Sequence, residues 1–277
     1  LKIHSPQIYK RHYYVVICII MNKNILQKIK IMIKTIRIFK NWYLYPIVYF
    51  KLTKNDYVIF ETKNNLKIKI RVNSTDLMAL THVWLIEEYS FPGFEINEND
   101  LIIDIGAHIG LFSLFSSQYC KNGKILSFEP IKENYELLVE NLRLNNIKNV
   151  YPFNKAVSEN NSDVTLFLNK DESGHSMYSS EGKSIQVKST SLKIIFEENK
   201  LDKCNFLKLD CEGAEYTIID SLSEEYFNKI EKMIIEYHLA DTKPELLTSL
   251  KSKLKTFFYS MDTKPLFSDI GFLYAKK

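Results

Sequence analysis

From residue 101 onward, short apolar runs alternate with segments that have the periodicity of a helix. The apolar runs cover residues 101–105, 124–128, 149–154, 206–209 and 233–237, and the helical segments cover 109–120, 132–144 and 214–222. Short apolar strands that alternate with helices are typical of a parallel sheet with both faces covered. The sequence therefore predicts an α/β fold with a mostly parallel sheet and helices on both faces.

The hundred residues before this alternation have a different pattern. Residues 57–72 indicate two strands around a Lys-Asn-Asn turn, and residues 73–89 indicate a helix with Ser74 or Thr75 as its N-cap. We therefore divide the chain into a basic, hydrophobic N-terminal arm (residues 1–55), a hairpin and helix that lead into the core (residues 56–100), and a main domain (residues 101–277).

The arm is basic, whereas the rest of the chain is acidic. Residues 1–55 hold eleven Lys and Arg and no Asp or Glu, and the remainder holds 26 basic and 33 acidic side chains. Residues 24–40 repeat apolar side chains at three- and four-residue steps, and aromatic residues follow at 41–50. This amphipathic helix either packs on the domain or lies in a membrane interface. The second alternative gives the hypothesis of peripheral membrane contact through residues 23–50.

Two features bear on the compartment. The apolar run at residues 13–21 is much shorter than the roughly 20 residues that a membrane-spanning helix needs. Cys18, Cys120, Cys204 and Cys211 form no C-x-x-C pair and have no zinc-site spacing. We expect four reduced, buried thiols and a cytoplasmic protein, with the arm as its hypothetical point of contact with a membrane.

The predicted strand at 101–105 ends in a segment with the composition of a cofactor site. It reads Asp104-Ile-Gly106-Ala-His-Ile-Gly110 and opens the next helix. Gly106 allows a tight turn and close backbone approach, and the start of the helix offers free N–H groups. Glu129 ends the following strand 19 residues after Gly110, where a carboxylate can accept both hydroxyls of a ribose.

Two cofactor classes use this layout. A dinucleotide is usually bound by G-x-G-x-x-G, but the spacing here is G-x-x-x-G, and His108 occupies the position of the second glycine. S-adenosyl-L-methionine has no phosphate and carries an ammonium and a sulfonium, for which the Asp104 carboxylate is a fitting neighbour. The segment therefore favours a nucleoside attached to a cation. The alternative is that Asp104 only caps the helix.

A second polar group lies at the ends of two later strands. Charged side chains in apolar surroundings are costly unless they have a function, so these are candidate catalytic residues. Glu215 and His238 also have a structural interpretation, as a first-turn helix acid and as a loop histidine with satisfied hydrogen bonds. The group comprises Lys208, Asp210, Glu212 and Glu215 after residue 206, and Glu236 and His238 after residue 233.

Residues 168–184, rich in Ser and Gly, lie between two expected strands. They form either a flexible wall over the acceptor, with His175 and Tyr178 facing it, or an ordinary surface loop.

Taken together, several blocks of this sequence resemble the FkbM family of methyltransferases. The blocks run from about residue 73 to residue 238 and include D-x-G-A-x-x-G at 104–110, F-E-P at 128–130, K-x-D-x-E-G-A-E at 208–215 and I-I-E-Y-H at 234–238. The family consists of class I enzymes that use S-adenosyl-L-methionine and are generally regarded as O-methyltransferases. The resemblance implies a Rossmann-like, seven-stranded, mostly parallel sheet with an antiparallel strand near one edge, for which residues 256–261 and 271–276 can supply the last two strands.

The resemblance also implies which residues bind the cofactor. Where this chain has His108 the family usually has Asn, so that contact is a departure and is a candidate for pH dependence. The implied residues are Asp104, Gly106, Ala107, His108 and Gly110 for the methionine part, Glu129, Pro130 and Asn134 for the ribose, and Asn154 and Ala156 for the adenine.

The expected reaction is methyl transfer to a hydroxyl group on a sugar, polysaccharide, lipid-linked or natural-product acceptor. Asp210 or His238 is the expected base, Lys208 orients an acidic partner or a substrate oxygen, and Glu212 is a further candidate. Carboxylates at Asp210 and Glu212 suit Mg²⁺, but the sequence has no clear ligand set, so no metal is predicted.

Two other classes of protein share such a cofactor domain. A nucleic-acid (RNA) methyltransferase would place the basic arm on phosphates, but the body is acidic and no N-P-P-Y-like tetrapeptide follows residue 209. A non-catalytic S-adenosylmethionine-binding module would not need the acidic group. We therefore expect a hydroxyl-bearing small molecule or glycan, rather than a nucleic acid, as the acceptor.

Overall fold

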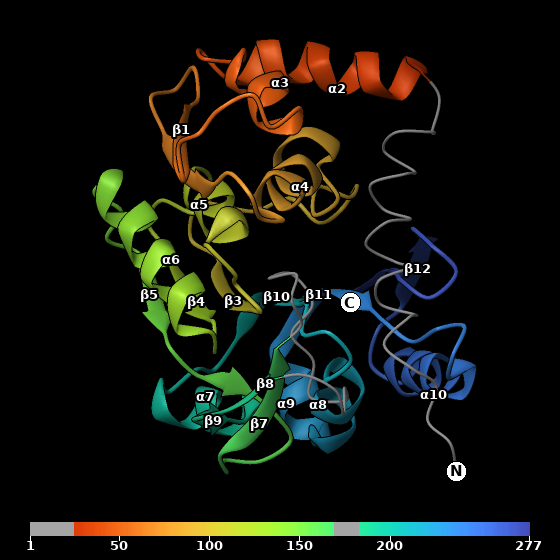
Figure 1. The fold of residues 1–277 in the computed structure, drawn as a ribbon. Helices are drawn as coiled ribbons and strands as arrows, with labels where there is room; N and C mark the ends of the chain where they lie inside the picture. The colour runs from red at the N-terminus through yellow and green to blue at the C-terminus, as the bar shows by residue number, and fades with distance from the viewer. Residues whose placement is uncertain (1–24, 169–182) are drawn as a thin grey trace.

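A single seven-stranded sheet organises the chain in the computed structural model, which describes residues 25–168 and 183–277 (Figure 1). The strand order is β12-β13-β11-β10-β3-β4-β5. Strands β11, β10, β3, β4 and β5 pair in parallel, and β13 pairs antiparallel with both β11 and β12. The Rossmann-like sheet with an antiparallel strand near one edge is therefore confirmed. The strands are β3 (Leu101–Ile105), β4 (Lys124–Phe128), β5 (Val150–Phe153), β10 (Cys204–Leu209), β11 (Ile230–Tyr237), β12 (Ser260–Pro265) and β13 (Gly271–Lys276).

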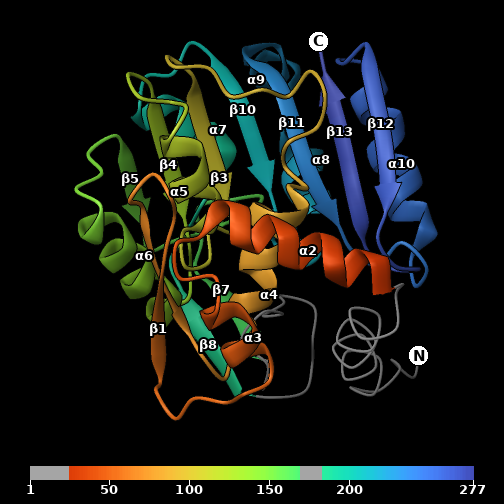
Figure 2. The same ribbon diagram turned by 90° about the horizontal axis from the view of Figure 1, so that it is seen from above.

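Helices cover both faces of this sheet, as Figure 2 shows. Successive strand residues point to opposite faces, so Ile102 belongs to one buried apolar cluster and Ile103 to the other. The first cluster includes α5 (Leu111–Ser117) and α6 (Lys132–Leu144). The second cluster includes α7 (Leu192–Glu198), α8 (Glu215–Ser221), α9 (Glu224–Lys229) and α10 (Pro244–Lys255).

The segment before residue 101 packs on the first face and shares its core. The ring of Trp84 contacts those of Phe39 and Phe115, which join the N-terminal segment to α5. The backbone of Lys69 exchanges hydrogen bonds with the Asn141 side chain of α6, at 2.7 and 3.1 Å. The elements are α2 (Ile25–Ile38), α3 (Leu44–Tyr49), β1 (Tyr57–Glu61), β2 (Lys67–Arg71), α4 (Asp76–Leu80) and the π-helix η1 (Thr81–Ile86).

One strand was placed wrongly from the sequence. The apolar run at residues 256–261 was expected to form the edge strand, which the structure instead places at Ser260–Pro265. The N–H groups of Phe257 and Phe258 donate to the carbonyl of Leu254, so these residues continue the end of α10 as a turn. Phe258 is buried in the second cluster, which explains its apolar character without a strand.

Two further pairs of strands lie outside this sheet. β6 (Ala156–Val157) pairs with β9 (Ser189–Thr190), and β7 (Val164–Leu168) pairs with β8 (Lys183–Val187). The predicted wall residues His175 and Tyr178, and also Cys18, lie outside the described residues. The other cysteines are free thiols; Cys120 and Cys204 are buried, whereas Cys211 is half-buried, contrary to expectation, because it follows β10 at the edge of the sheet.

The turn after β3 lies directly against the end of β10. Gly106 has a φ of +73°, and a Cβ at this position would lie 1.7 Å from the carbonyl oxygen of Asp210. Only glycine combines this backbone conformation with so close an approach. The fold therefore brings the predicted cofactor segment and the predicted catalytic group together.

Candidate active site

A buried ion pair joins the carboxyl ends of β3 and β10. The Nζ of Lys208 lies 3.1 Å from the Oδ1 of Asp104 and 3.7 Å from the Oδ2 of Asp210. The same ammonium donates to the carbonyl of Gly106 at 2.8 Å, and the Oδ2 of Asp104 accepts from the Ser113 hydroxyl at 2.6 Å. Burial favours the neutral amine, but Asp104 and Asp210 outweigh it and hold the pKa of Lys208 above its ordinary value. Lys208 is therefore a cation that anchors the turn at Gly106.

The same turn is also tied to β4. The N–H groups of Gly106 and Ala107 both donate to the carbonyl of Phe128, each at 3.0 Å. Gly110 has a φ of +85° at the start of α5, and a Cβ there would lie 3.0 Å from the Cγ of Leu138. The segment from Asp104 to Gly110 is thus fixed by both neighbouring strands.

Glu129 directly follows β4 and is almost fully buried. Its Oε2 accepts from the backbone N–H of His108 and its Oε1 from that of Ile131, each at 2.8 Å, and the Asn134 amide lies 3.5 Å from Oε1. Burial raises the pKa of Glu129 to about 7, despite these donors. Each carboxylate oxygen has two lone pairs, so Oε2 retains one for a hydroxyl group, and a hydroxyl group at Oε1 would replace the long contact with Asn134.

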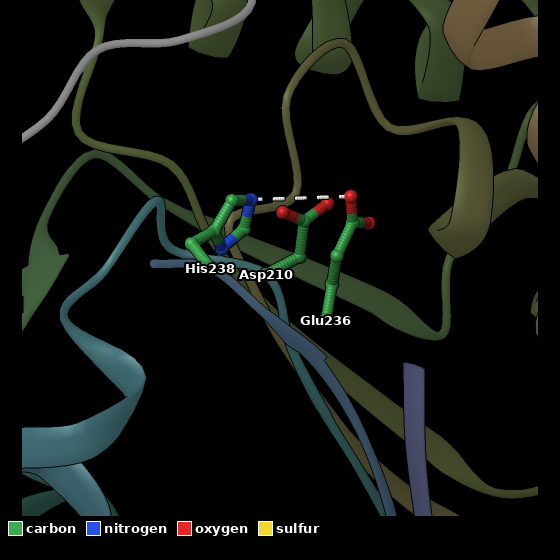
Figure 3. A group of neighbouring side chains, drawn as sticks. All are labelled: Asp210, Glu236 and His238. Atoms are coloured by element: carbon green, nitrogen blue, oxygen red, sulfur yellow. Dashed lines mark ion pairs between the residues drawn. The ribbon is translucent and has the colours of Figure 1, made fainter. Parts of the chain in front are cut away.

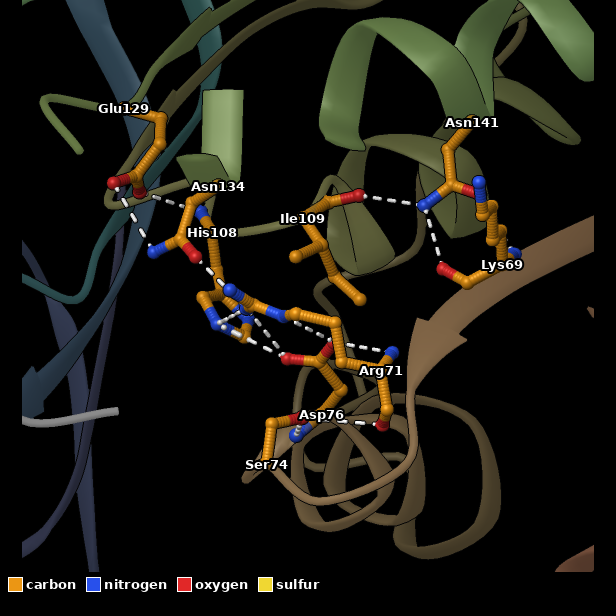
Figure 4. A network of polar contacts seen from close by, with 9 residues as sticks. All are labelled: Lys69, Arg71, Ser74, Asp76, His108, Ile109, Glu129, Asn134 and Asn141. Carbon is orange, nitrogen blue, oxygen red and sulfur yellow. Dashed lines mark hydrogen bonds and ion pairs between the residues drawn. The ribbon is translucent and has the colours of Figure 1, made fainter. Parts of the chain in front are cut away.

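A network that the sequence did not predict lies beside Glu129 (Figure 4). The Arg71 guanidinium holds both oxygens of Asp76, at 2.8 and 2.9 Å, and donates to the Oδ1 of Asn134 at 2.8 Å. Asp76 is fully buried; burial would raise its pKa, but Arg71 and His108 outweigh that effect and lower it. Arg71 and Asp76 come from β2 and α4, so the segment before residue 101 contributes to the site.

His108 adopts a left-handed conformation, with a φ of +50°. Its Nε2 lies 3.3 Å from the Arg71 guanidinium and 3.5 Å from the Oδ1 of Asp76. Burial holds the pKa of His108 below its ordinary value, although Asp76 acts in the opposite direction. A neutral imidazole therefore completes the network.

The residues expected at the adenine lie after β5. The Asn154 amide donates to the carbonyls of Glu129 and Pro130, each at 2.9 Å. Ala156 is buried in β6, where its N–H donates to the carbonyl of Lys188 at 2.9 Å. Asn154 thus brings the loops after β4 and β5 together at one edge of the sheet.

The predicted catalytic side chains meet at the ends of β10 and β11. Asp210, Glu236 and His238 converge in Figure 3, and one ligand-type atom from each lies within 4.8 Å of the other two. The Tyr89 hydroxyl, which the sequence did not predict, lies 3.4 Å from carboxylate oxygens of both Asp210 and Glu236. Burial is the main cause that holds the pKa of Glu236 well above its ordinary value, and the negative charge of the nearby Asp210 adds to it.

His238 is held between several carboxylates. Its Nε2 lies 3.5 Å from Glu212 and 3.9 Å from Glu236, and its Nδ1 lies 3.3 Å from the Oε1 of Glu215. Burial favours neutral imidazole, but Glu212 and Glu215 outweigh it and hold the pKa of His238 well above its ordinary value. Burial also raises the pKa of Glu212 to about 7. The ring is therefore a cation at neutral pH.

Glu215 has a positioning role in this cluster. It is fully buried, and its two oxygens accept the backbone N–H groups of Gly213 and His238, each at 2.8 Å. These contacts join the start of α8 to the end of β11. Glu215 is therefore a first-turn acid of α8, and His238 has hydrogen-bond partners, as the structural interpretation of the sequence expected. Both residues also belong to the candidate site.

Comparison with known proteins identifies the family. The model of the FkbM methyltransferase domain matches residues 104–262, more than half of the chain. The chain belongs to the FkbM methyltransferase family. It is accordingly a methyltransferase, with S-adenosyl-L-methionine as its methyl donor.

The relatives of this FkbM-family chain differ in what they modify. Methyltransferase 1 of Beauveria bassiana is 25% identical over 174 residues, covering 55% of this chain and 69% of that protein. The hexuronic acid methyltransferase AglP of Haloferax volcanii is 26% identical over 162 residues, covering 58% and 65%. A tRNA(Phe) (4-demethylwyosine(37)-C(7)) aminocarboxypropyltransferase of Methanocaldococcus jannaschii is 35% identical over 81 residues, covering 29% and 31%.

The geometry fits an S-adenosylmethionine site. Glu129 keeps acceptor capacity for a hydroxyl donor, and glycine at position 106 lets the turn after β3 pack against the carbonyl of Asp210. Asp104 is fully buried and paired with Lys208, so it contributes to this site by holding the ammonium that binds the carbonyl of Gly106.

Arg71→Met should lower the free energy of unfolding by about 3–5 kcal/mol at neutral pH, because it leaves the buried Asp76 carboxylate without its cation. The pKa of Asp76 is below its ordinary value of 3.8, so the pair stabilises the fold above that pH and loses its effect as the pH falls. Urea unfolding of both proteins should show a difference that shrinks as the pH falls toward and below about pH 4, because Asp76 without its cation takes up a proton more readily.

Two controls accompany this measurement. Arg71→Met combined with Asp76→Asn removes the buried charge and should recover most of the loss. Lys34→Met breaks the exposed pair with Glu87 and should cost less than about 1 kcal/mol. Equal losses in the single and double variants would show that the buried charge is not the cause.

Proposed function

We propose that this enzyme transfers a methyl group from S-adenosyl-L-methionine to a hydroxyl group of a sugar, polysaccharide, lipid-linked or natural-product acceptor. The observation that carries the proposal is that Lys208 contacts both the carbonyl of Gly106 in this turn and the carboxylate of Asp210, which clusters with Glu236 and with His238, the neighbour of Glu212. Proton acceptors thus adjoin the cofactor segment. The relative AglP, named for methylation of a hexuronic acid, supports a carbohydrate acceptor.

The chain's residues have two tasks in this reaction. S-adenosyl-L-methionine, when bound, supplies an electrophilic methyl group on a sulfonium, which leaves as a neutral thioether. The protein holds the acceptor oxygen in line with that methyl group and removes the hydroxyl proton as the new bond forms. Asp210 and Glu212 are the carboxylates placed for this proton. His238 is less suited to be the base, because its raised pKa leaves it protonated at neutral pH.

The cofactor would lie along the carboxyl ends of β3, β4 and β5. We assign the ribose hydroxyls to Glu129, with Asn134 and Pro130 beside it, and the adenine to the side of Asn154 and Ala156. The methionine part would lie against the turn that contains Gly106, Ala107 and Gly110, with Asp104 and His108 as further neighbours. Lys208 then orients this turn through the carbonyl of Gly106.

A nucleic-acid acceptor is the alternative. Its support is the short match to a tRNA-modifying enzyme, which covers 31% of that protein. Against it, the side chains at the acceptor end of the sheet are mostly acidic, which repels a phosphate backbone. A non-catalytic module is disfavoured by the same cluster of buried and half-buried acids.

A membrane-proximal acceptor would fit the surface of α2. One face of this helix buries Ile31 and Thr35, whereas Ile29, Ile33 and Ile36 on another face are each more than 40% exposed. Exposed basic residues flank this stripe, and exposed aromatic residues follow it: Lys28, Lys30, Arg37, Trp42, Tyr43 and Phe50. No helix in the described ranges has both the length and the apolar character to cross a bilayer. We propose that this face binds an anionic membrane surface.

Glu129→Gln tests the cofactor site. Calorimetric titration with S-adenosylmethionine should give tighter binding by the wild type at about pH 8 than at about pH 6, because the pKa of Glu129 is about 7 and only the carboxylate accepts both ribose hydroxyls. The variant should bind roughly tenfold or more weakly at the higher pH and lose this pH dependence. The exposed Glu133→Gln is the control, and wild-type binding by Glu129→Gln would refute the assignment.

Asp210→Asn tests the reaction. Methyl transfer should be assayed with sugars, uronic acids and polysaccharides on one side and with tRNA on the other. We expect methyl ethers on the hydroxyl acceptors, and a kcat lowered about 10²- to 10⁴-fold in the variant with little change in cofactor binding. Methylation of tRNA alone would establish the alternative function.

Ile29→Ser with Ile33→Ser tests the membrane proposal by flotation. The wild type should float with vesicles that contain anionic lipid, and much less with neutral vesicles, because basic residues border the stripe. The double variant should float at least about fivefold less, since it removes apolar area. Val139→Ser, which alters an exposed apolar residue of α6, should float like the wild type. Equal flotation of all three proteins would exclude the stripe as the contact.

A further inference from the structure

The cluster at the ends of β10 and β11 has the donor atoms of a metal site. Asp210 and Glu236 offer carboxylate oxygens and His238 offers an imidazole nitrogen, all within 4.8 Å of one another. When a divalent ion has bonds of about 2.0–2.2 Å to its ligand atoms, two ligand atoms of the same ion lie about 3 to 4.4 Å apart. The side chains of Asp210 and Glu236 are 28% and 19% exposed. They therefore have room to rotate and bring the three ligand atoms slightly closer together, to the distances that one ion requires.

The orientation of His238 is a second, independent observation. Its side chain is 8% exposed, and its Nδ1 faces the fully buried carboxylate of Glu215 at 3.3 Å. A histidine that ligates a metal almost always donates its other ring N–H to such a group, which fixes the ring and the tautomer. Here that contact directs Nε2 toward Glu236 and Asp210 (Figure 3). This Nε2 also lies 3.5 Å from the Oε2 of Glu212.

The carboxylates of Asp210 and Glu236 also share one hydrogen-bond donor. The Tyr89 hydroxyl has one proton and lies 3.4 Å from both Asp210 and Glu236, so it can serve only one of them at a time. Lys208 lies nearer to Asp104, at 3.1 Å, than to Asp210, at 3.7 Å. Two neighbouring carboxylates repel each other, and an ion between them would convert that repulsion into attraction.

We propose that Asp210, Glu236 and His238 bind a divalent cation that accepts mixed oxygen and nitrogen ligands, such as Mn²⁺ or Zn²⁺. Carboxylates suit Mn²⁺ and imidazole suits Zn²⁺, and a three-residue set leaves positions open for other ligands. His238 releases its proton when Nε2 binds the ion. This site replaces the sequence-based expectation of no metal, and its ligands differ from the pair of Asp210 and Glu212 that the sequence suggested.

The cation has a role in the proposed function, on which this part of the inference rests. An acceptor hydroxyl bound at an open position would be oriented and made more acidic. As its O–H bond breaks, the proton passes to the Glu212 carboxylate, and the oxygen forms a bond to the methyl carbon while the electron pair of the S–CH₃ bond returns to sulfur. With Asp210 engaged by the ion, Glu212 is the remaining carboxylate for the proton.

Direct metal binding tests the site without any assay of activity. The full chain, untagged and freed of metal with a chelator, should be titrated calorimetrically with Mn²⁺, Zn²⁺ and Mg²⁺, and with Mn²⁺ by electron paramagnetic resonance. We expect one site per chain, with Mn²⁺ or Zn²⁺ bound at least about tenfold more weakly in Asp210→Asn and Glu236→Gln. Glu215→Gln, which replaces the carboxylate behind His238 and leaves the three proposed ligands unchanged, should weaken binding about 10- to 100-fold.

The control is Asp220→Asn, an exposed carboxylate of α8, which should bind metal like the wild type. Cofactor titration of each variant verifies that the fold is intact. No binding of any of the three ions by the wild type, or unchanged affinity in both Asp210→Asn and Glu236→Gln, would overturn the proposal. Metal binding without methyl transfer to any hydroxyl acceptor would leave the site standing and refute the proposed function instead.

Discussion

The ion pair between Lys208 and Asp104 is the contact on which the rest of the site depends. The two residues are Cα partners in the parallel pairing of β10 with β3, so their side chains lie side by side in the sheet. Both are buried, and loss of either partner would leave an uncompensated charge in the core. Because Lys208 also holds the carbonyl of Gly106, one ammonium fixes the cofactor segment relative to Asp210. The spacing between cofactor and acceptor groups is therefore a property of the sheet.

The charged groups around this pair act on stability in opposite directions. Asp76 has a lowered pKa and stabilises the fold at neutral pH, whereas Glu129 and Glu212, with pKa values of about 7, bind more protons folded than unfolded. For the latter two, stability falls as the pH rises from their ordinary values of 4.5 toward 7. Burial of carboxylates at such a cost is typical of functional sites. The network of Arg71 with Asp76 offsets part of that cost beside the cofactor segment.

The sequence predicted those features that depend on local pattern. The strands Leu101–Ile105, Lys124–Phe128 and Gly271–Lys276 have the expected bounds, because burial on both faces requires an uninterrupted apolar run. Arg71 and Tyr89 were missed because nothing near them in sequence reveals that β2 and the end of η1 pack against the strand ends. Their only local signals, a cation at the end of a strand and an aromatic ring after a helix, are common in ordinary cores.

His108 shows how such long-range packing changes a motif position. Asn, which the family resemblance leads us to expect there, and His are both enriched in the left-handed region, so the φ of +50° suits either residue. The longer side chain of His108 reaches Arg71 and Asp76, contacts that the shorter Asn could not make in the same way. Because burial keeps the pKa of His108 below its ordinary value, the ring stays neutral around pH 7 and the contact does not titrate there. The residue at this position therefore depends on the hairpin and α4, which lie outside the motif itself.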